Sequence, residues 1–418
     1  MLQTMTPGKA PPVHVGSEPQ AVATTENHPP APEAIHYPEE FQKFTTNPAS
    51  ITAKTARLFG VSPNTVTHWR WHMKRQITRA QDVPGSVGLD VGESAGFEQL
   101  SHLFQTGVTP YYLSLMNPDP SVPCAIRTQA LPRIDELYDP MGQKDPLDEV
   151  PHSPVKEVVQ VYPDRVAFCV AQLCPVYCRY CFRKRRDDEE GLHYNRKIVE
   201  QGLAYIASNP AIRDVLVTGG DPFIASDDAI VSLAARLRAI PHVDIIRFGT
   251  RTPVTLPYRV TRELAQRLAA YHPIFINTHF NCAEELTPEA ITAVTNLVNQ
   301  GFPVGNQAVL LKGVNDNPES MLALSRALLK ARVRPYYLFH PHLVEGTAHL
   351  RVSVHQGLKI MRFMRGRITG LGIPTYIIDT PAGKIPMTPQ HILGEDGDDL
   401  LLEDRYGRIW REKGVLAP

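Results

Sequence analysis

The chain has 418 residues, and its 43 Lys and Arg balance 43 Asp and Glu, so the formal net charge at pH 7 is zero. A balanced charge provides no general attraction to nucleic acid or to an anionic membrane surface, and we expect neither as a partner. No apolar run is long enough to cross a bilayer, and the N-terminus lacks the basic-then-apolar order of a signal peptide, so we predict a cytoplasmic location. Length alone allows one large barrel with terminal additions or two ordinary domains.

The first part of the chain is predicted to be a disordered tail. Residues 1–45 are rich in proline and poor in large aliphatic side chains, which cannot repay the entropy of ordering. Residues 46–155 have a helical pattern, in which Ser62 and Pro63 indicate a helix start. Part of this region superficially resembles a helix-turn-helix, but Trp69 and Trp71 favour packing over reading a DNA groove.

From Arg165 onward, short β-rich apolar runs alternate with amphipathic helical stretches. The predicted strands are 166–170, 215–218, 245–249, 274–278, 304–311, 335–339 and 375–378. The predicted helices include 198–208, 229–239, 262–271, 288–300 and 318–331. Strands separated by helices pair in parallel through right-handed crossovers, so the predicted architecture is a curved or closed α/β barrel. Chemistry in such a barrel gathers at the C-terminal ends of the strands.

Three of the six cysteines crowd into one short segment. Cys174, Cys178 and Cys181 form a C-x3-C-x2-C triplet directly after the first predicted barrel strand. A structural zinc site normally needs four protein ligands, and no second Cys/His pair with matching spacing is evident. A cubane cluster held by three cysteines keeps one iron open for a small molecule. The other cysteines are isolated and are interpreted as small buried side chains.

This triplet resembles that of the radical-SAM superfamily, in which a [4Fe–4S] cluster binds S-adenosylmethionine at its fourth iron. One electron from the reduced cluster cleaves the sulfonium and yields a 5′-deoxyadenosyl radical, which can take an unactivated hydrogen. The resemblance implies a one-electron reductant of the flavodoxin or ferredoxin type. It also implies an α/β fold, a radical-SAM partial (β/α)6-type barrel. We expect its core at residues 156–345, with the N-terminal helical segment before it and a C-terminal extension at 346–418 after it.

Several segments, in the same order, resemble the lysine 2,3-aminomutase family. They are 69–71, 162–166, 178–181, 219–222, 251–254, 277–281, 305–307 and 383–386. The resemblance implies an isomerase that uses pyridoxal phosphate as well as the cluster and S-adenosylmethionine. In such an enzyme the radical removes a hydrogen from C3 of an amino acid held as an aldimine, and the nitrogen migrates from C2 to C3. The product is a β-amino acid.

The resemblance also implies roles for the residues that bind pyridoxal phosphate and the substrate. Lys384 matches the lysine that forms the Schiff base with the cofactor. Arg183 matches the arginine that pairs with the substrate α-carboxylate, a task that suits a guanidinium fork. Arg165 and Arg251 are candidates for the cofactor phosphate, and a structural ion pair is the alternative for each.

Five residues are predicted to surround S-adenosylmethionine. Gly219, Gly220 and Asp221 resemble the glycine-rich turn of the superfamily, where bare backbone lets the methionyl ammonium approach carbonyl oxygens. His279 and Gln307, also at strand ends, resemble family residues around the same molecule.

Two positions bear on the substrate. Lysine-specific family members use two aspartates to receive the distal ammonium; Asp379 matches one, whereas the other position falls at His342. A buried ammonium without compensation is costly, so the loss of one carboxylate makes arginine a candidate beside lysine. A glutamate or other amino acid 2,3-aminomutase is the alternative, and an iron–sulfur DNA-binding regulator that uses residues 54–71 is a remote one.

Assembly is predicted from the family alone. Some members have cysteines that form a structural zinc site near the C-terminus, but no cysteine follows Cys282 here, so no assembly through that metal is expected. Family members are commonly oligomeric, and we therefore expect a homo-oligomer.

Overall fold

The computed structural model describes residues 50–184, 196–388, 391–404 and 407–416. All of them belong to one compact unit, Glu39–Pro418. The predicted tail at 1–45 lies outside the described residues. The predicted internal boundaries after residues 155 and 345 stay predictions.

The centre of this unit is a nine-stranded sheet whose strands follow chain order from β1 to β9. The strands are β1 (Val158–Tyr162), β2 (Arg165–Ala171), β3 (Asp214–Gly219), β4 (Ile245–Gly249), β5 (Ile274–Thr278), β6 (Val304–Val309), β7 (Arg334–Phe339), β8 (Thr375–Thr380) and β9 (Gly383–Pro386). Strands β2 to β8 pair in parallel, and β1 and β9 are antiparallel at the two edges. The seven predicted strands are therefore confirmed as β2 to β8.

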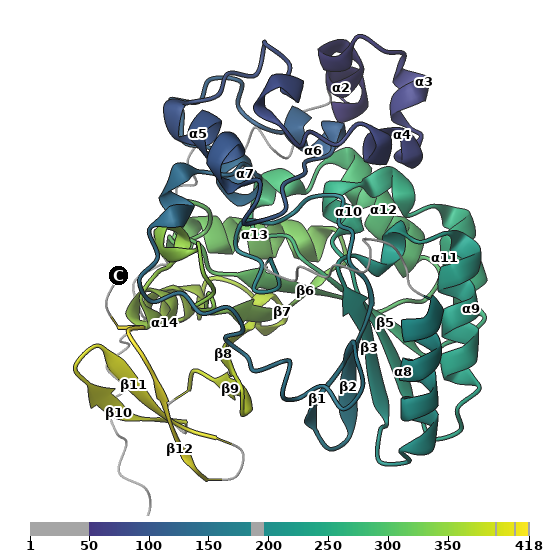
Figure 1. Cartoon of the computed structure of the whole chain (residues 1–418), viewed down its shortest axis with the longest axis vertical. Helices are drawn as coiled ribbons and strands as arrows, with labels where there is room; N and C mark the ends of the chain where they lie inside the picture. The colour runs from purple at the N-terminus through teal and green to yellow at the C-terminus, as the bar shows by residue number, and fades with distance from the viewer. Residues whose placement is uncertain (1–49, 185–195, 389–390, 405–406, 417–418) are drawn as a thin grey trace, which may run out of the picture. The chain divides into compact units, whose positions relative to one another are not determined.

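A helix follows each of the strands β2 to β7, which is the predicted (β/α)6 pattern. These helices are α8 (Arg196–Ser208), α9 (Asp227–Arg238), α11 (Arg262–Ala269), α12 (Pro288–Val298), α13 (Pro318–Lys330) and α14 (Val354–Met364). Five of them begin at a side chain that accepts a hydrogen bond from the first turn: Ser226, Thr261, Thr287, Asn317 and Ser353. Figure 1 shows α8, α9 and α11 beside one another along the outside of the sheet, and each has a buried apolar face.

The barrel is partial, because β1 and β9 stand at opposite ends of the strand order. One hydrogen bond joins these two edges: the backbone N–H of Lys384 in β9 donates to the Tyr162 hydroxyl in β1 over 2.6 Å. The sheet therefore curves far enough for its edges to meet through a side chain.

The N-terminal region consists of α2 (Ile51–Phe59), α3 (Pro63–Val66), α4 (Trp69–Lys74), α5 (Val91–Leu100), α6 (Pro110–Ser114) and α7 (Ala125–Ala130), gathered at one end of the barrel (Figure 1). Ser62 caps α3, as predicted. The Arg259 guanidinium lies 4.8 Å over the Trp69 ring, and Trp71 packs edge-on against Phe59 at 5.8 Å. The segment that resembles a helix-turn-helix thus packs against the barrel.

Smaller elements complete the fold. The helix α10 (Thr252–Thr255) follows β4, and short 3-10 helices occur at Ala80–Asp82, Ile134–Leu137, Pro222–Ile224, Pro257–Arg259, Ala283–Glu285, Ala348–Leu350 and Gly370–Gly372. A separate antiparallel sheet of β10 (Ile392–Asp396), β11 (Asp399–Glu403) and β12 (Ile409–Glu412) was not predicted.

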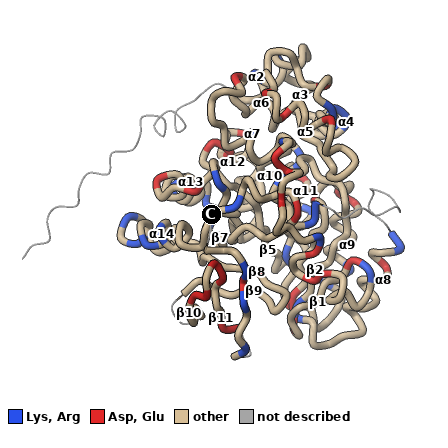
Figure 2. Tube along the Cα trace, turned by 60° about the vertical axis from the view of Figure 1, so that its left-hand side comes forward, with Lys and Arg blue, Asp and Glu red and all other residues tan. Residues whose placement is uncertain are grey.

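Charged positions of both signs are scattered over the described part of the chain (Figure 2). Among the described residues, no helix has both the length and the apolar character that a bilayer crossing requires.

Candidate active site

A large cavity of about 1470 Å³ lies inside the partial barrel. All the residues predicted for the site line it: Arg165, Cys174, Cys178, Cys181, Arg183, Gly219, Gly220, Asp221, Arg251, His279, Gln307, His342, Asp379 and Lys384. Ligand pockets usually measure about 300–1,000 Å³, so this cavity has room for more than one small molecule. Most of these residues sit at or beyond the C-terminal ends of strands; Arg165, at the start of β2, is an exception.

The three cysteines occupy the loop after β2. The Cys181 amide donates to the Cys178 carbonyl over 3.1 Å, which makes a tight turn between them. Burial raises the pKa of the Cys174 thiol, and Asp221 and the other two cysteines raise it further. Three thiolates held so close together need nearby positive charge, which a metal cluster supplies.

The three cysteines form a donor set on one loop that lines the cavity. Within the described ranges, no three His, Cys, Asp or Glu side chains are placed to hold a single metal ion. Three cysteines on a cubane leave its fourth iron open for a small molecule. The donor set therefore fits a [4Fe–4S] cluster.

A buried ion network anchors this loop. The Arg179 guanidinium, which lies between Cys178 and Cys181 in sequence, binds both oxygens of Glu136 at 2.8 and 2.6 Å, and the two side chains are 1% and 0% exposed. Lys184 adds a third bond to Glu136 at 2.8 Å. Burial alone would raise the pKa of Glu136, but Arg179 and Lys184 lower it to about 2. Glu136 thus ties the cysteine loop to the N-terminal region.

We predict that Glu136→Gln lowers the free energy of unfolding by roughly 3 kcal/mol, because two buried cations lose their counter-charge. The effect should be complete above the ordinary pKa of a glutamate and should fade as the pH falls towards about 2, where the native carboxylate is itself protonated. Thermal melting at several pH values measures it. Glu200→Gln, which removes a carboxylate from an exposed Arg236 pair, is the matched control and should change little. Equal melting of both variants would contradict the prediction.

The glycine-rich turn at the end of β3 packs against the entry of the cysteine loop. A Cβ on Gly220 would lie 2.5 Å from the backbone of Gln172 and Leu173, and Gly219 has a φ of +123°. The Asp221 carboxylate accepts from Thr250 Oγ1 at 2.6 Å and from the amide of Arg251 at 2.7 Å. The turn therefore needs bare backbone, and Asp221 ties the end of β3 to the end of β4.

Arg251 and His279 meet beside the cysteines. Arg251 Nη1 donates to Cys178 Sγ at 2.7 Å, and its Nε donates to the His279 carbonyl at 3.1 Å. Burial, together with the Arg251 charge, lowers the pKa of His279 to about 4, so its imidazole is neutral at pH 7. Arg251 follows β4 whereas Arg165 begins β2, and the structure does not bring these two phosphate candidates together.

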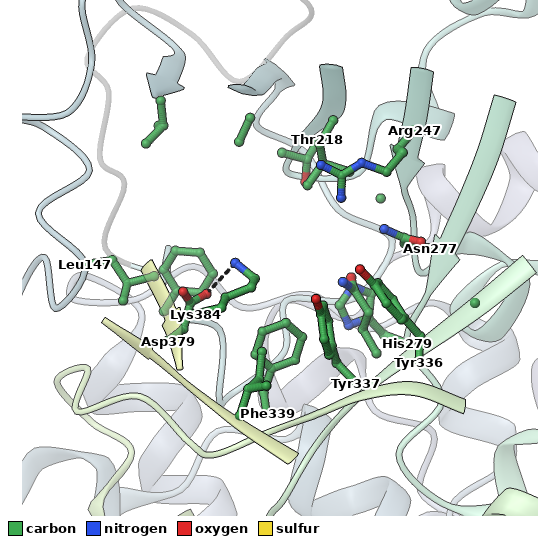
Figure 3. A pocket seen from close by; sticks show the side chains of 18 of the residues that line it. Leu147, Thr218, Arg247, Asn277, His279, Tyr336, Tyr337, Phe339, Asp379 and Lys384 are labelled. Carbon is green, nitrogen blue, oxygen red and sulfur yellow. Dashed lines mark hydrogen bonds and ion pairs between the residues drawn. The ribbon is translucent and has the colours of Figure 1, made fainter. Parts of the chain in front are cut away.

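Strands β8 and β9 contribute Asp379 and Lys384 to the cavity, and the two residues are cross-strand partners. Figure 3 shows the Lys384 side chain reaching toward the Asp379 carboxylate, with Nζ 2.9 Å from Oδ2. His342 Nε2 lies 4.0 Å from the same carboxylate and has no hydrogen-bond partner among the described residues. Burial lowers the pKa of His342.

Arg183 is held by a residue that sequence reasoning missed. Its Nε and Nη2 donate to the two oxygens of Glu149 at 2.9 and 2.5 Å, and both side chains line the cavity. Glu149 is one acidic residue in a charged loop, so no pattern singled it out. Tyr162 was also missed as a site residue, although it begins one of the matching segments.

Comparison with known proteins decides the family. The model of the "Radical SAM superfamily" matches residues 169–324. "L-lysine 2,3-aminomutase" of Bacillus subtilis (strain 168) is 39% identical over 82% of this chain and 73% of its own length. The chain belongs to the lysine 2,3-aminomutase family.

Other members of this aminomutase family are about equally similar. "Glutamate 2,3-aminomutase" of Clostridioides difficile (strain 630) is 37% identical over 86% of this chain and 86% of its own length. "L-lysine 2,3-aminomutase" of Fusobacterium nucleatum is 40% identical over 82% of this chain and 81% of its own length. These values support an amino acid 2,3-aminomutase, an isomerase with a [4Fe–4S] cluster and S-adenosylmethionine. Sequence identity to these relatives does not distinguish lysine from glutamate as the substrate.

Proposed function

We propose that this aminomutase moves the α-amino group of L-lysine or L-arginine to the β-carbon and that Lys384 binds pyridoxal phosphate. The observation that supports a basic substrate is the Asp379 carboxylate, which pairs with the Lys384 ammonium in the cavity. Its side chain is 13% exposed, so it depends on a nearby donor.

Attachment of the cofactor would change that pairing. A lysine nitrogen bonded to the cofactor carries at most one hydrogen, whereas the free ammonium carries three. Before substrate binds, Asp379 then lacks a charged donor, and the distal cation of an arriving basic substrate supplies one. When the substrate amine takes the place of the lysine on the cofactor, Lys384 is released as a neutral amine and brings no competing cation. A glutamate side chain would instead bring a second negative charge to Asp379, and like charges that close together repel.

His342 bears on the choice between the two basic substrates. A neutral imidazole beside Asp379 adds no charge, but its unpartnered Nε2 can accept a hydrogen bond. A guanidinium offers five N–H groups and can reach Asp379 and His342 together, whereas an ammonium offers three. This geometry supports arginine as well as lysine.

Other residues of the cavity bind and orient the substrate and the cofactor. Glu149 holds the Nε–Nη2 edge of Arg183, which leaves the Nη1 side for the substrate α-carboxylate. Arg165, which stacks 3.5 Å over the Tyr162 ring, is the candidate for the cofactor phosphate. When bound, the cluster with S-adenosylmethionine supplies a hydrogen-abstracting radical, and pyridoxal phosphate supplies the conjugation through which nitrogen migrates.

Product analysis tests the proposal. Anaerobically reconstituted protein, with pyridoxal phosphate, S-adenosylmethionine and dithionite in place of the natural flavodoxin or ferredoxin, is incubated separately with L-lysine, L-arginine and L-glutamate. We expect the β-isomer of lysine or arginine by mass spectrometry after derivatisation. Turnover of glutamate alone would overturn the basic-substrate proposal, and no β-isomer from any amino acid would overturn the wider one.

We predict that Asp379→Asn lowers kcat/KM for the basic substrate by roughly 10²–10³-fold, because the distal cation loses its charged partner. Steady-state kinetics with the amino acid that is turned over measures this loss. Asp244→Asn, which breaks an exposed pair with Arg213, is the control and should keep the native kcat/KM. A native kcat/KM in Asp379→Asn would show that the distal group binds elsewhere.

A further inference from the structure

The guanidinium of Arg251 is fixed against one of the three cysteine sulfurs. Its Nη1 lies 2.7 Å from Cys178 Sγ, and the side chain is only 8% exposed. This contact joins residues 73 positions apart in the sequence. It involves a residue that sequence reasoning had considered for the cofactor phosphate.

The remaining nitrogens of Arg251 are also engaged, so the group cannot turn away from the sulfur. Nε donates to the His279 carbonyl at 3.1 Å. Nη2 lies 2.7 Å from Gln129 Oε1 and 2.6 Å from Glu285 Oε1. Nη2 also donates to the Tyr112 hydroxyl at 3.1 Å, and a planar guanidinium held by four separate partners points its remaining nitrogen, Nη1, in one direction.

The counter-charge of Arg251 binds a different nitrogen from the one that contacts the sulfur. Glu285 binds Nη2, whereas Cys178 binds Nη1. The Glu285 carboxylate is 0% exposed and also accepts from Tyr112 Oη and the Asn281 amide, both at 2.6 Å. The sulfur therefore meets the positive group directly and the negative group only at a greater distance.

We propose that Arg251 is a positioning residue that orients Cys178 and raises the reduction potential of the [4Fe–4S] cluster. This inference rests on the proposed function only through the cluster. Reduction adds one negative charge to the cluster, and some of that charge resides on the coordinating sulfurs. A charged N–H donor at the sulfur stabilises the reduced state more than the oxidised state, and hydrogen bonds to sulfur are one way in which proteins set cluster potentials.

The test is a redox titration of the cluster followed by electron paramagnetic resonance, with holoprotein and without substrate or S-adenosylmethionine. In Arg251→Gln we expect at least a tenfold fall in the equilibrium constant for reduction, which corresponds to a midpoint about 59 mV more negative. Arg247→Gln is the matched control: this arginine lies on β4, the strand that Arg251 follows, and lines the same cavity, but its Nε binds Asp214 at 2.8 Å. Its midpoint should stay near the native value.

Glu285→Gln provides a second measurement of opposite sign. It removes the carboxylate that balances Arg251, so the midpoint should become more positive. If Arg251→Gln loses its iron, Arg251→Lys is measured instead. It keeps the charge but lacks the planar fork that holds a nitrogen at the sulfur, so its midpoint should still be more negative than that of the wild type. Native midpoints in the iron-loaded variants would overturn the inference while leaving the proposed function intact. A wild-type protein that assembles no cluster would contradict both.

Discussion

Replacement of Lys384 by alanine is expected to abolish turnover and the imine absorbance of the cofactor while leaving the iron content unchanged. The reason is chemical: an alanine has no nitrogen that can attach to the carbonyl of pyridoxal phosphate. We expect kcat to fall by roughly 10⁴-fold or more, the scale seen when a residue of a covalent mechanism is removed.

The structure indicates that this substitution leaves the sheet contact and the cysteine loop unchanged. The contact between the sheet edges uses the backbone N–H of Lys384, which alanine keeps, so the Tyr162 bond should survive. The cysteine loop follows β2, whereas Lys384 lies on β9.

Absorbance spectra, iron analysis and product assays of the same preparation test the three parts of this prediction. Lys359→Ala, at an exposed position of α14, is the control and should retain absorbance and turnover. An unchanged imine band in Lys384→Ala would mean that another lysine holds the cofactor.

Replacement of Cys181 by serine is expected to remove most of the bound iron and all radical chemistry. A serine hydroxyl is a hard, protonated ligand, whereas iron–sulfur clusters require soft thiolates. Cys181 is one of only three thiols in the loop, so no spare ligand stands beside it among the described residues. The variant should also fail to cleave S-adenosylmethionine under strong reductant.

Cys124→Ser provides the control for this change. Cys124 does not line the cavity, and its sulfur accepts a hydrogen bond from the Asn117 amide at 3.4 Å. Iron analysis and the yield of 5′-deoxyadenosine should match the wild type. Zinc in place of iron in the wild-type protein, or a Cys181→Ser variant with native iron content, would contradict the assignment of the cluster.

The strands and helices of the barrel could be predicted because each has one apolar face with a regular period. The strands β4 and β5 were predicted with their observed bounds, 245–249 and 274–278. The antiparallel strands β9 to β12 were harder to predict. Strand β9 is only four residues long, and of β10 to β12 only β11 has buried positions, so none of the three contains a long buried apolar run. Short strands of this kind are stabilised by their neighbours more than by their own pattern.

The residues of the candidate site also fall into those that a local signal predicted and those that it did not. The cysteine triplet could be found because its ligands are close in sequence, and Lys384 because its segment matches a family. The partners of these residues could not be found. Glu149 beside Arg183, and Tyr162 beside Lys384, are separated from them by 34 and 222 positions and follow no spacing rule.

By itself the sequence determined the alternation of strands and helices, the cluster-binding loop and the family, because these depend on local periodicity, short ligand spacing and matching segments. Only the tertiary structure decided that all the predicted residues share one cavity and that Arg251 donates to Cys178. It also decided that Asp379 pairs with Lys384. The physical reason is curvature: the twist and closure of a parallel sheet bring strand ends together, and no local pattern of residues encodes those distances.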